Sequence, residues 1–432
     1  MFICDCLDVN ERGHLTIGGA DVPQLAQKYG TPLFLMDEDS IRATCRALRA
    51  ALQKHYAGDS LVTYASKAFS CKYIYRVMHQ EGMGADVASG GELYTAINAG
   101  FPADRIYFHG NNKTEREINL GLDAGVGRFV VDNREELLAL NERAAQKGVV
   151  PDIALRITPG VEAHTHEFIQ TGKIDSKFGL TLENGQAEDV LKQAVELPNV
   201  NLVGIHCHIG SQIFEAEPFA HTVKLMMGFM ATIRDRLGYT LRELNLGGGF
   251  GIRYIDSHEP RSVDEVVRLT ARAVAEQAEQ LDLPLPHLVL EPGRLIVGPN
   301  GITVYTIGAV KEIPGVRTYI SVDGGMTDNP RFALYGATYE ALLPERPGAV
   351  RDRVVTIAGR CCESGDLLAK DVRFPEAQPG ELLAVLATGA YTYSMASHYN
   401  RVPRPPVVMV SGGTDRLAVR RELYEDLVAL DE

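Results

Sequence analysis

The chain has 432 residues, 45% of them hydrophobic and 23% charged, which is typical of globular domains and excludes a disordered or collagen-like protein. Lys and Arg number 43 against 56 Asp and Glu, a net charge of −13 at pH 7. Nucleic acids and anionic membranes recruit basic surfaces, so we expect neither as a partner. Seven cysteines, an odd number without a CxxC pair, indicate reduced thiols in the cytoplasm and no metal site. The N-terminus lacks the basic and apolar regions of a signal peptide, and no apolar run is long enough to predict a membrane span.

From residue 60 onward, short Val/Ile/Leu-rich runs alternate with segments of helical period. Eight runs predict strands, at 61–67, 84–89, 105–109, 128–132, 152–157, 202–208, 244–247 and 287–291. Their nearly continuous hydrophobicity is typical of strands that are buried on both faces. Helices are expected between them, including 90–99, 133–147 with Asn133 as its N-cap, and 262–280 with a Ser262…Glu265 capping box. Eight such units predict a (β/α)8 TIM-type barrel, with a doubly wound parallel sheet as the alternative.

The pattern changes after Arg294. Short strands are expected at 302–313, 318–323, 353–359, 382–388 and 407–411, separated by turns rich in Gly, Pro and Asp. They predict a second, all-β domain of sandwich or barrel type. A ninth strand at 33–36 precedes a long helix at 40–56 and is assigned to the β domain. We therefore expect a barrel at 38–292 and a β domain formed by 1–37 and 293–432.

Polar side chains come at the ends of six predicted barrel strands: Lys67, Asp86, His109, Arg156, His208 and Glu291. Active sites of (β/α)8 barrels lie at the carboxyl ends of the strands. One such residue is more often structural, but several at the same end indicate a site. The connection 158–179 is too long for an ordinary turn, which favours a lid or a binding loop.

Residues 247–251 read GGGFG after the seventh strand. Consecutive glycines can close backbone N–H groups around a phosphate, although the same run can be a tight turn. A lysine at an apolar strand end, here Lys67, can form a Schiff base with an aldehyde. A lysine and a phosphate loop together suggest pyridoxal 5′-phosphate (PLP), whose ring nitrogen Glu291 could keep protonated and on whose face His208 could stack.

Motifs over nearly the whole chain support this interpretation. They are YASKAF (64–69), ADVASGGEL (85–93), SKFG (176–179), HCHIGSQ (206–212), GGGFG (247–251), EPGR (291–294), ALYGA (333–337), CESGD (362–366) and GAYTYSMAS (389–397). With these motifs the chain resembles the fold-type III PLP-dependent decarboxylases, which combine an alanine-racemase-like barrel with a β domain. Within that family it is most similar to the enzymes that decarboxylate meso-2,6-diaminopimelate to L-lysine and CO₂, the last step of bacterial lysine synthesis.

The resemblance implies a role for each matching residue. Lys67 would carry PLP and His208 would stack on its ring. The rest of the cofactor site would be formed by Asp86, Ser211, Gly247, Gly248, Gly249, Glu291, Gly293, Arg294 and Tyr391, with Glu291 on the ring nitrogen and Ser211, the three glycines and Tyr391 on the phosphate. Arg294, Arg331, Tyr335 and Tyr391 would line the substrate site, where arginine suits a carboxylate. Glu363 would meet the distal ammonium, and Cys362 would be the general acid that protonates the carbanion.

The resemblance also implies a homodimer in which Cys362 and Glu363 enter the neighbouring subunit's site. The chain departs from the family pattern in the order Pro330-Arg331 and in Tyr339, which stands where a histidine is usual. Two alternatives remain. One is a related decarboxylase of another diamino or guanidino acid, such as ornithine, arginine or carboxynorspermidine, and the other is a non-catalytic regulatory homologue. Arg331 and CESGD favour diaminopimelate, whereas Lys67, Cys362 and Glu291 favour an enzyme.

Overall fold

The structure is a computed structural model that describes residues 2–161 and 176–432. The chain divides into two compact units. One comprises Thr44–Gly251 and Pro260–Gly293, and the other Met1–Ala43, Ile252–Glu259 and Arg294–Glu432. The short segment Ile252–Glu259 therefore belongs to the second unit, although it directly follows the glycine run.

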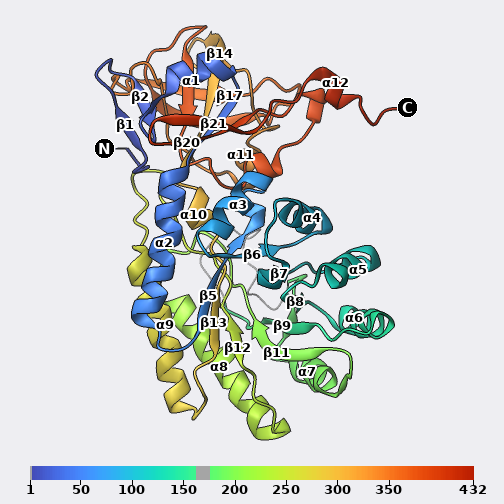
Figure 1. The fold of residues 1–432 in the computed structure, drawn as a ribbon. Helices are drawn as coiled ribbons and strands as arrows, with labels where there is room; N and C mark the ends of the chain where they lie inside the picture. The colour runs from blue at the N-terminus through green and yellow to red at the C-terminus, as the bar shows by residue number, and fades with distance from the viewer. Residues whose placement is uncertain (1, 162–175) are drawn as a thin grey trace. The chain divides into compact units, whose positions relative to one another are not determined.

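The first unit is a closed barrel of eight parallel strands (Figure 1). The strands are β5 (Ser60–Ala65), β6 (Gly84–Val87), β7 (Ile106–Phe108), β8 (Arg128–Val131), β9 (Asp152–Thr158), β11 (Asn201–His206), β12 (Glu243–Asn245) and β13 (His287–Leu290). Pairing of β13 with β5 and of β8 with β9 closes the ring, and β10 (Leu180–Thr181) adds a short parallel pairing to β9. The predicted TIM-type barrel is confirmed, and a doubly wound sheet is excluded because such a sheet stays open.

Helices surround these strands: α3 (Lys72–Gln80), α4 (Gly90–Asn98), α5 (Glu115–Ala124), α6 (Arg134–Lys147), α7 (Gln186–Glu196), α8 (Glu217–Leu237) and α9 (Val263–Gln280). Figure 1 shows α4 to α7 side by side outside the strands. The boundary between the two units falls within α2 (Glu38–His55). Among the described residues, no helix combines the length and hydrophobicity needed to cross a bilayer.

Local sequence signals set the helix ends. The Asn133 side chain accepts the Glu136 N–H at the start of α6, and Gly148 ends that helix in the left-handed region, as expected. Ser262 caps α9 by accepting the Glu265 N–H at 3.2 Å. The expected capping box is only half formed, because the Glu265 carboxylate accepts a hydrogen bond from Arg261 at 2.5 Å. A guanidinium one residue before the cap competes for the carboxylate that would otherwise turn back to the cap.

The second unit is built mainly of strands, as predicted. Its main sheet has the order β18 (Leu367–Phe374), β17 (Arg353–Ala358), β15 (Arg317–Val322), β14 (Gly301–Ile313), β4 (Leu33–Asp37), β20 (Val407–Ser411) and β21 (Thr414–Val419). Strands β19 (Leu382–Val385) and β16 (Ala341–Leu342) pair beside β14, while β1 (Leu7–Val9), β2 (Leu15–Ile17) and β3 (Ala20–Asp21) form a separate sheet. The ninth predicted strand, β4, lies between β14 and β20, so its assignment to this sheet is confirmed.

The helices of the second unit are short: α1 (Val22–Tyr29), α10 (Arg294–Val297), α11 (Arg331–Tyr335) and α12 (Tyr424–Leu427). Apolar residues of its strands pack with Ile252 and Tyr254 into one core. This explains why the segment after the glycine run belongs here. Burial in that core removes the apolar surface of these two side chains from water, which stabilises the folded chain.

Candidate active site

The centre of the barrel site is the buried carboxylate of Glu291, which directly follows β13. Its Oε1 accepts hydrogen bonds from Asn245 Nδ2 at 2.7 Å and from His109 Nε2 at 2.8 Å. Its Oε2 lies 3.2 Å from His206 Nε2. Asn245 ends β12, His206 ends β11 and His109 follows β7. Closure of the barrel therefore brings together donors from three strand ends around one carboxylate.

These neighbours decide the charge of Glu291. Burial acts to raise the pKa of Glu291, but its contacts with His109 and His206 outweigh it and hold this pKa well below its usual value. Burial lowers the pKa of His206 to about 3, more than its contact with Glu291 raises it. Glu291 is consequently an anion, and His206 is a neutral donor to it.

Asp86, at the end of β6, is a second buried acid in the same site. Its Oδ1 lies 3.7 Å from His109 Nε2. Burial raises the pKa of Asp86, against the opposing charge of His109. His109 therefore faces two carboxylates and is closer to Glu291. Three side chains of this site, those of His109, His206 and Glu291, also have ligand types suited to a metal ion.

Lys67 lies in a single 3₁₀ turn (Ser66–Ala68) directly after β5, and its side chain is exposed between two buried neighbours. The Ala65 N–H donates to the Pro292 carbonyl at 3.3 Å. A Cβ on Gly293 would lie 2.9 Å from Ala65 Cβ and 3.0 Å from Ala68 Cβ. Glycine at 293 thus allows the turn that carries Lys67 to pack against the segment that carries Glu291.

The glycine run has a structural role at each of its first three positions. A Cβ on Gly247 would lie 2.7 Å from the Cys207 carbonyl, one on Gly248 2.2 Å from the Glu291 carbonyl, and one on Gly249 2.3 Å from the Gly210 carbonyl. Real Cβ atoms do not approach so closely, so these positions require glycine whether or not an anion binds. The Gly247 N–H donates a hydrogen bond to Asn245 Oδ1 at 2.9 Å, and the Gly248 N–H donates one to His208 Nδ1 at 3.3 Å.

His208, two residues beyond β11, accepts the Gly248 N–H and so presents a fixed ring beside the glycine run. Burial lowers the pKa of His208 well below its usual value, and the positive charge of Lys67 lowers it further. The ring is therefore neutral. Ser211 follows in the turn before Gln212, whose φ of 63° lies in the left-handed region.

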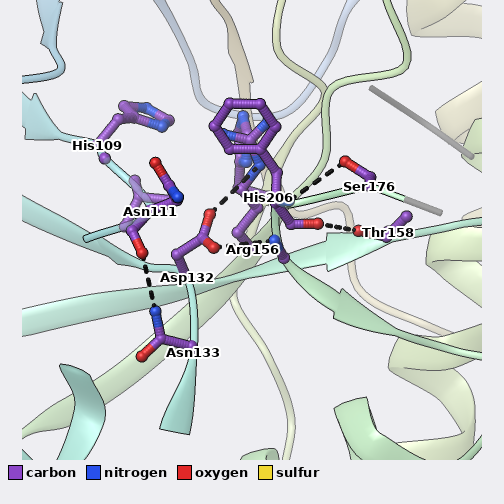
Figure 2. Close-up of polar contacts among 12 residues, drawn as sticks. His109, Asn111, Asp132, Asn133, Arg156, Thr158, Ser176 and His206 are labelled. Atoms are coloured by element: carbon purple, nitrogen blue, oxygen red, sulfur yellow. Dashed lines mark hydrogen bonds and ion pairs between the residues drawn. The ribbon is translucent and has the colours of Figure 1, made fainter. Parts of the chain in front are cut away.

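A second group of side chains surrounds Arg156 on β9 (Figure 2). Its guanidinium carbon lies 4.4 Å from the centre of the Phe178 ring, and Arg156 Nε is 3.8 Å from Asp132 Oδ1. The Phe178 carbonyl accepts from the Thr158 hydroxyl at 2.6 Å, and Asp132 Oδ2 accepts the Gly179 N–H at 3.0 Å. Both described ends of the predicted lid are thus held at the barrel. The rest of it, residues 162–175, lies outside the described residues.

The second unit holds a cluster of two arginines and three tyrosines. Tyr254 lies between the arginines: Arg294 Nη1 donates to its hydroxyl at 2.5 Å, and the Arg331 guanidinium carbon lies 4.8 Å from the centre of its ring. Arg331 Nη1 donates to the Tyr339 hydroxyl at 2.5 Å, and the Arg294 guanidinium stacks 4.6 Å from the Tyr391 ring. Both arginines are buried.

The arginines and tyrosines of this cluster shift one another's pKa. Burial acts to raise the pKa of Tyr254, but Arg294 and Arg331 outweigh it and lower this pKa. Burial acts to lower the pKa of Arg331, but its tyrosine neighbours outweigh it and raise this pKa. Two guanidinium groups placed together in this way suit an anionic ligand such as a carboxylate.

The remaining predicted residues also lie in the second unit. Tyr335 ends α11 and is partly exposed. Cys362 and Glu363 are exposed on the loop between β17 and β18. Cys361, its neighbour, is half-buried, and burial raises its pKa to about 11.

The sequence patterns give no specific role to four residues of the site. His206 lies within the HCHIGSQ motif and His109 among the strand-end side chains, but neither is predicted to contact Glu291, and Asn245 and Tyr254 are not predicted as site residues. The position of His206 and Asn245 at strand ends could have indicated a place in the site. No local pattern indicates Tyr254, because its partners are distant in sequence.

The barrel site and the strand-rich unit define the class: a (β/α)8 barrel that presents a lysine, an ionised buried carboxylate and a glycine run at its strand ends, as in PLP-dependent decarboxylases. Residues 38–298 match the family described as pyridoxal-dependent decarboxylase, pyridoxal binding domain.

Full-length relatives narrow this class. The diaminopimelate decarboxylase of Bacillus subtilis (strain 168) is 49% identical over 432 residues, covering 100% of this chain and 98% of that protein. The crystal structure of the diaminopimelate decarboxylase from M. jannaschii with L-lysine has a TM-score of 0.93 at 35% identity, covering 100% of this chain and 99% of that one. The Helicobacter pylori enzyme with L-lysine has a TM-score of 0.86 at 30% identity, covering 95% of this chain and 99% of that one. The chain belongs to the diaminopimelate decarboxylase family.

Proposed function

We propose that this protein is a PLP-dependent carboxy-lyase that converts meso-2,6-diaminopimelate to L-lysine and CO₂, in bacterial lysine synthesis. The observation that carries the proposal is the ionised Glu291 carboxylate, held by His109, Asn245 and His206 at the strand ends. A fixed buried anion is what a protonated pyridine nitrogen needs as its partner. The family membership points to the same cofactor.

The residues at the barrel end fit PLP. Bound PLP supplies an electron sink for the negative charge that remains when CO₂ leaves. Lys67 would supply the amine that holds the cofactor aldehyde, Glu291 would pair with the ring nitrogen, and neutral His208 would stack on the ring without adding a competing charge. Since the N–H groups of Gly247 and Gly248 already have acceptors, Gly249 and Ser211 would donate to the phosphate together with Tyr391, with Asp86, Gly293 and Arg294 completing the site.

Substrate choice is proposed to rest on the arginine cluster. Arg294, Arg331, Tyr335 and Tyr391 would bind the carboxylate at the non-reacting end of the substrate, and Glu363 would bind the ammonium beside it. Two buried guanidinium groups that lie together favour a substrate with a second carboxylate, because the guanidinium fork matches carboxylate geometry. Ornithine, arginine and carboxynorspermidine lack a carboxylate at that position and would not make this contact.

The proton that replaces CO₂ would come from Cys362. Its side chain is exposed and therefore able to reach a bound ligand, whereas burial raises the pKa of Cys361. A protonated thiol at Cys362 Sγ would deliver the proton to the α-carbon on one face of the substrate. Exclusion of water from that carbon would keep solvent from delivering the proton at random.

We propose further that two chains share each active site, with Cys362 and Glu363 of the strand-rich domain (1–37 and 293–432) completing the barrel site (38–292) of the neighbouring subunit. The exposure of this catalytic loop supports the proposal. Mixing inactive Lys67→Ala chains with inactive Cys362→Ala chains should restore activity, because one of the two composite sites then has both groups intact. If verified mixed dimers stay inactive, each site is built from one chain. The net charge and the odd number of cysteines support a cytoplasmic location.

The proposal is tested by comparing CO₂ release from meso-diaminopimelate, ornithine, arginine and lysine. We expect turnover of meso-diaminopimelate to exceed that of the other three by at least about 10- to 150-fold, the factor that corresponds to one charged hydrogen bond. Lys67→Ala should fold but lose both the visible absorbance of the lysine-bound cofactor and turnover. Faster release from ornithine or arginine would assign the protein to a related decarboxylase, and a colourless wild-type protein that takes up no PLP would exclude an enzyme of this class.

A further inference from the structure

The loop that carries Cys362 is held on itself by backbone hydrogen bonds. It connects β17 and β18, and the N–H of Glu363 donates to the Cys361 carbonyl at 2.8 Å. The N–H of Asp366 donates to the Glu363 carbonyl at 3.1 Å. These two bonds shape a tight turn, but they do not connect the turn to the rest of the unit.

Asp366 makes that connection at the base of the turn. This buried carboxylate accepts the Cys361 N–H on Oδ2 at 2.7 Å and the Met326 N–H on Oδ1 at 2.6 Å. The backbone approaches it closely, since a Cβ on Gly359 or Gly325 would lie 2.2 or 2.4 Å from its oxygens. Asp366 therefore joins the Cys362 loop to the segment that leads to Arg331.

Asn400 makes the second connection, directly at Cys362. Its Oδ1 accepts the Cys362 N–H at 2.7 Å. Asn400 and Arg401 have φ values of 52° and 56°, so two successive non-glycine residues occupy the left-handed region. Such a backbone persists only where neighbouring contacts hold it. Here the Arg401 N–H donates to the His398 carbonyl at 2.8 Å and the Arg401 guanidinium donates to the Leu427 carbonyl at 3.1 Å.

We propose that Asn400 is a positioning residue for proton delivery. It works by fixing the backbone N–H of Cys362, while Asp366 anchors the foot of the same turn. The inference rests on the proposed role of Cys362 as general acid. With the N–H groups of both residues 361 and 362 bonded, rotation of the Cys362 side chain is the main freedom left to the thiol. Loss of the Asn400 bond releases the peptide unit to which that thiol is attached, and a small misplacement of a reacting group is enough to slow its step.

Two substitutions of Asn400 distinguish the effect of its side-chain oxygen from the effect of its left-handed backbone. In Asn400→Gly the left-handed conformation is retained and the acceptor is lost, whereas in Asn400→Asp an oxygen acceptor remains. In the holoenzyme we expect Asn400→Gly to lower kcat about 10-fold, with KM and the cofactor absorbance changed less than about 2-fold, and Asn400→Asp to stay within about 3-fold of wild type. The fall should be smaller than that of Cys362→Ala, since general acid catalysis contributes about 10²–10⁴-fold. Asn400→Asp, which keeps an oxygen acceptor at the same position, is the matched control.

Two further readouts decide the mechanism. In a double-mutant cycle, Asn400→Gly should have no further effect on kcat in the Cys362→Ala enzyme, because it acts through that thiol. Amide hydrogen exchange of the segment 361–366 should accelerate in Asn400→Gly but not in Asn400→Asp. Equal losses with and without Cys362, unchanged exchange, or unchanged kcat in Asn400→Gly would overturn the proposal. Normal turnover by Cys362→Ala would instead remove the general-acid role itself, and the positioning role with it.

Discussion

Two of the buried carboxylates of the barrel, those of Glu243 and Glu291, lie at opposite ends of its strands and are held by different donors. Glu243 begins β12 and accepts from Arg128 Nε at 3.0 Å, from Arg128 Nη2 at 2.7 Å and from the Tyr107 hydroxyl at 3.0 Å. Glu291 follows β13 and accepts from two imidazoles and an amide instead. Two side chains donate to Glu243 and three lie around Glu291, and of the two carboxylates only Glu243 is hydrogen-bonded to a guanidinium.

The difference separates stability from function within one barrel. Burial acts to lower the pKa of Arg128, but Glu243 outweighs it and raises this pKa, so the guanidinium stays charged at every ordinary pH. The imidazole and amide groups around Glu291 keep it ionised, and none of these hydrogen-bonding groups is a guanidinium with a permanent positive charge. A cationic ring nitrogen can therefore approach Glu291, whereas Arg128 would repel it. This fits the rule that residues at the carboxyl ends of barrel strands carry function and those at the amino ends carry stability.

The largest effect is expected from removing the charged partner of Glu243. In Arg128→Met, the carboxylate of Glu243 stays buried without its charged partner. We expect the free energy of unfolding, measured by urea denaturation, to fall by about 3–5 kcal/mol. The double variant Arg128→Met/Glu243→Leu should regain most of this loss, because it leaves no buried charge unpaired and Asp152, the other partner of Arg128, is partly exposed. A single variant of normal stability but low turnover would instead place Glu243 in the chemistry.

A smaller effect is expected at the functional end. In His109→Leu, Glu291 loses one donor, which costs about 1.5–3 kcal/mol for a hydrogen bond to a charged group. We expect roughly 10- to 150-fold weaker PLP binding, at about 1.4 kcal/mol per decade, as measured by titrating the apoprotein and following the visible absorbance. His109→Gln offers an amide donor in place of the imidazole and should recover part of the affinity. If both variants bind PLP like wild type, Glu291 does not depend on His109.

The smallest effect is a pH dependence. The pKa of His206 is lowered to about 3 from 6.5, so the folded protein keeps this ring neutral while the unfolded chain binds a proton below pH 6.5. Stability that is fully present above pH 6.5 is therefore lost as pH falls toward 3, by about 1.4 kcal/mol per pH unit. We expect His206→Gln to lose less stability than wild type between pH 6 and pH 5, measured by urea denaturation. The exposed His221 offers the control His221→Gln, which should follow wild type, and equal slopes in all three proteins would show that His206 titrates normally.

Much of the architecture was predictable because its signals are local. The eight barrel strands were recognised from continuous apolar runs, and Asn133 and Gly148 from the chemistry of helix ends. Strand β18 was missed, since its sequence LLAKDVRF carries charges and Asp371 interrupts it with a φ of 53°. A period-based prediction has no means of recognising such a bulged edge strand.

The site residues also divide into features that a local pattern predicts and features that depend on the fold. The order of residues along the chain shows which reactive groups are present and which predicted strand precedes each of them: Lys67 after β5, Glu291 after β13 and Cys362 after β17. Only the tertiary structure decided their partners. His109 is 182 residues from Glu291, and Asn400 is 38 residues from Cys362. The physical reason is that strand and helix patterns arise from neighbours along the chain, whereas the donors of a buried carboxylate, and the need for glycine at 247–249, depend on which segments the closed barrel brings into contact.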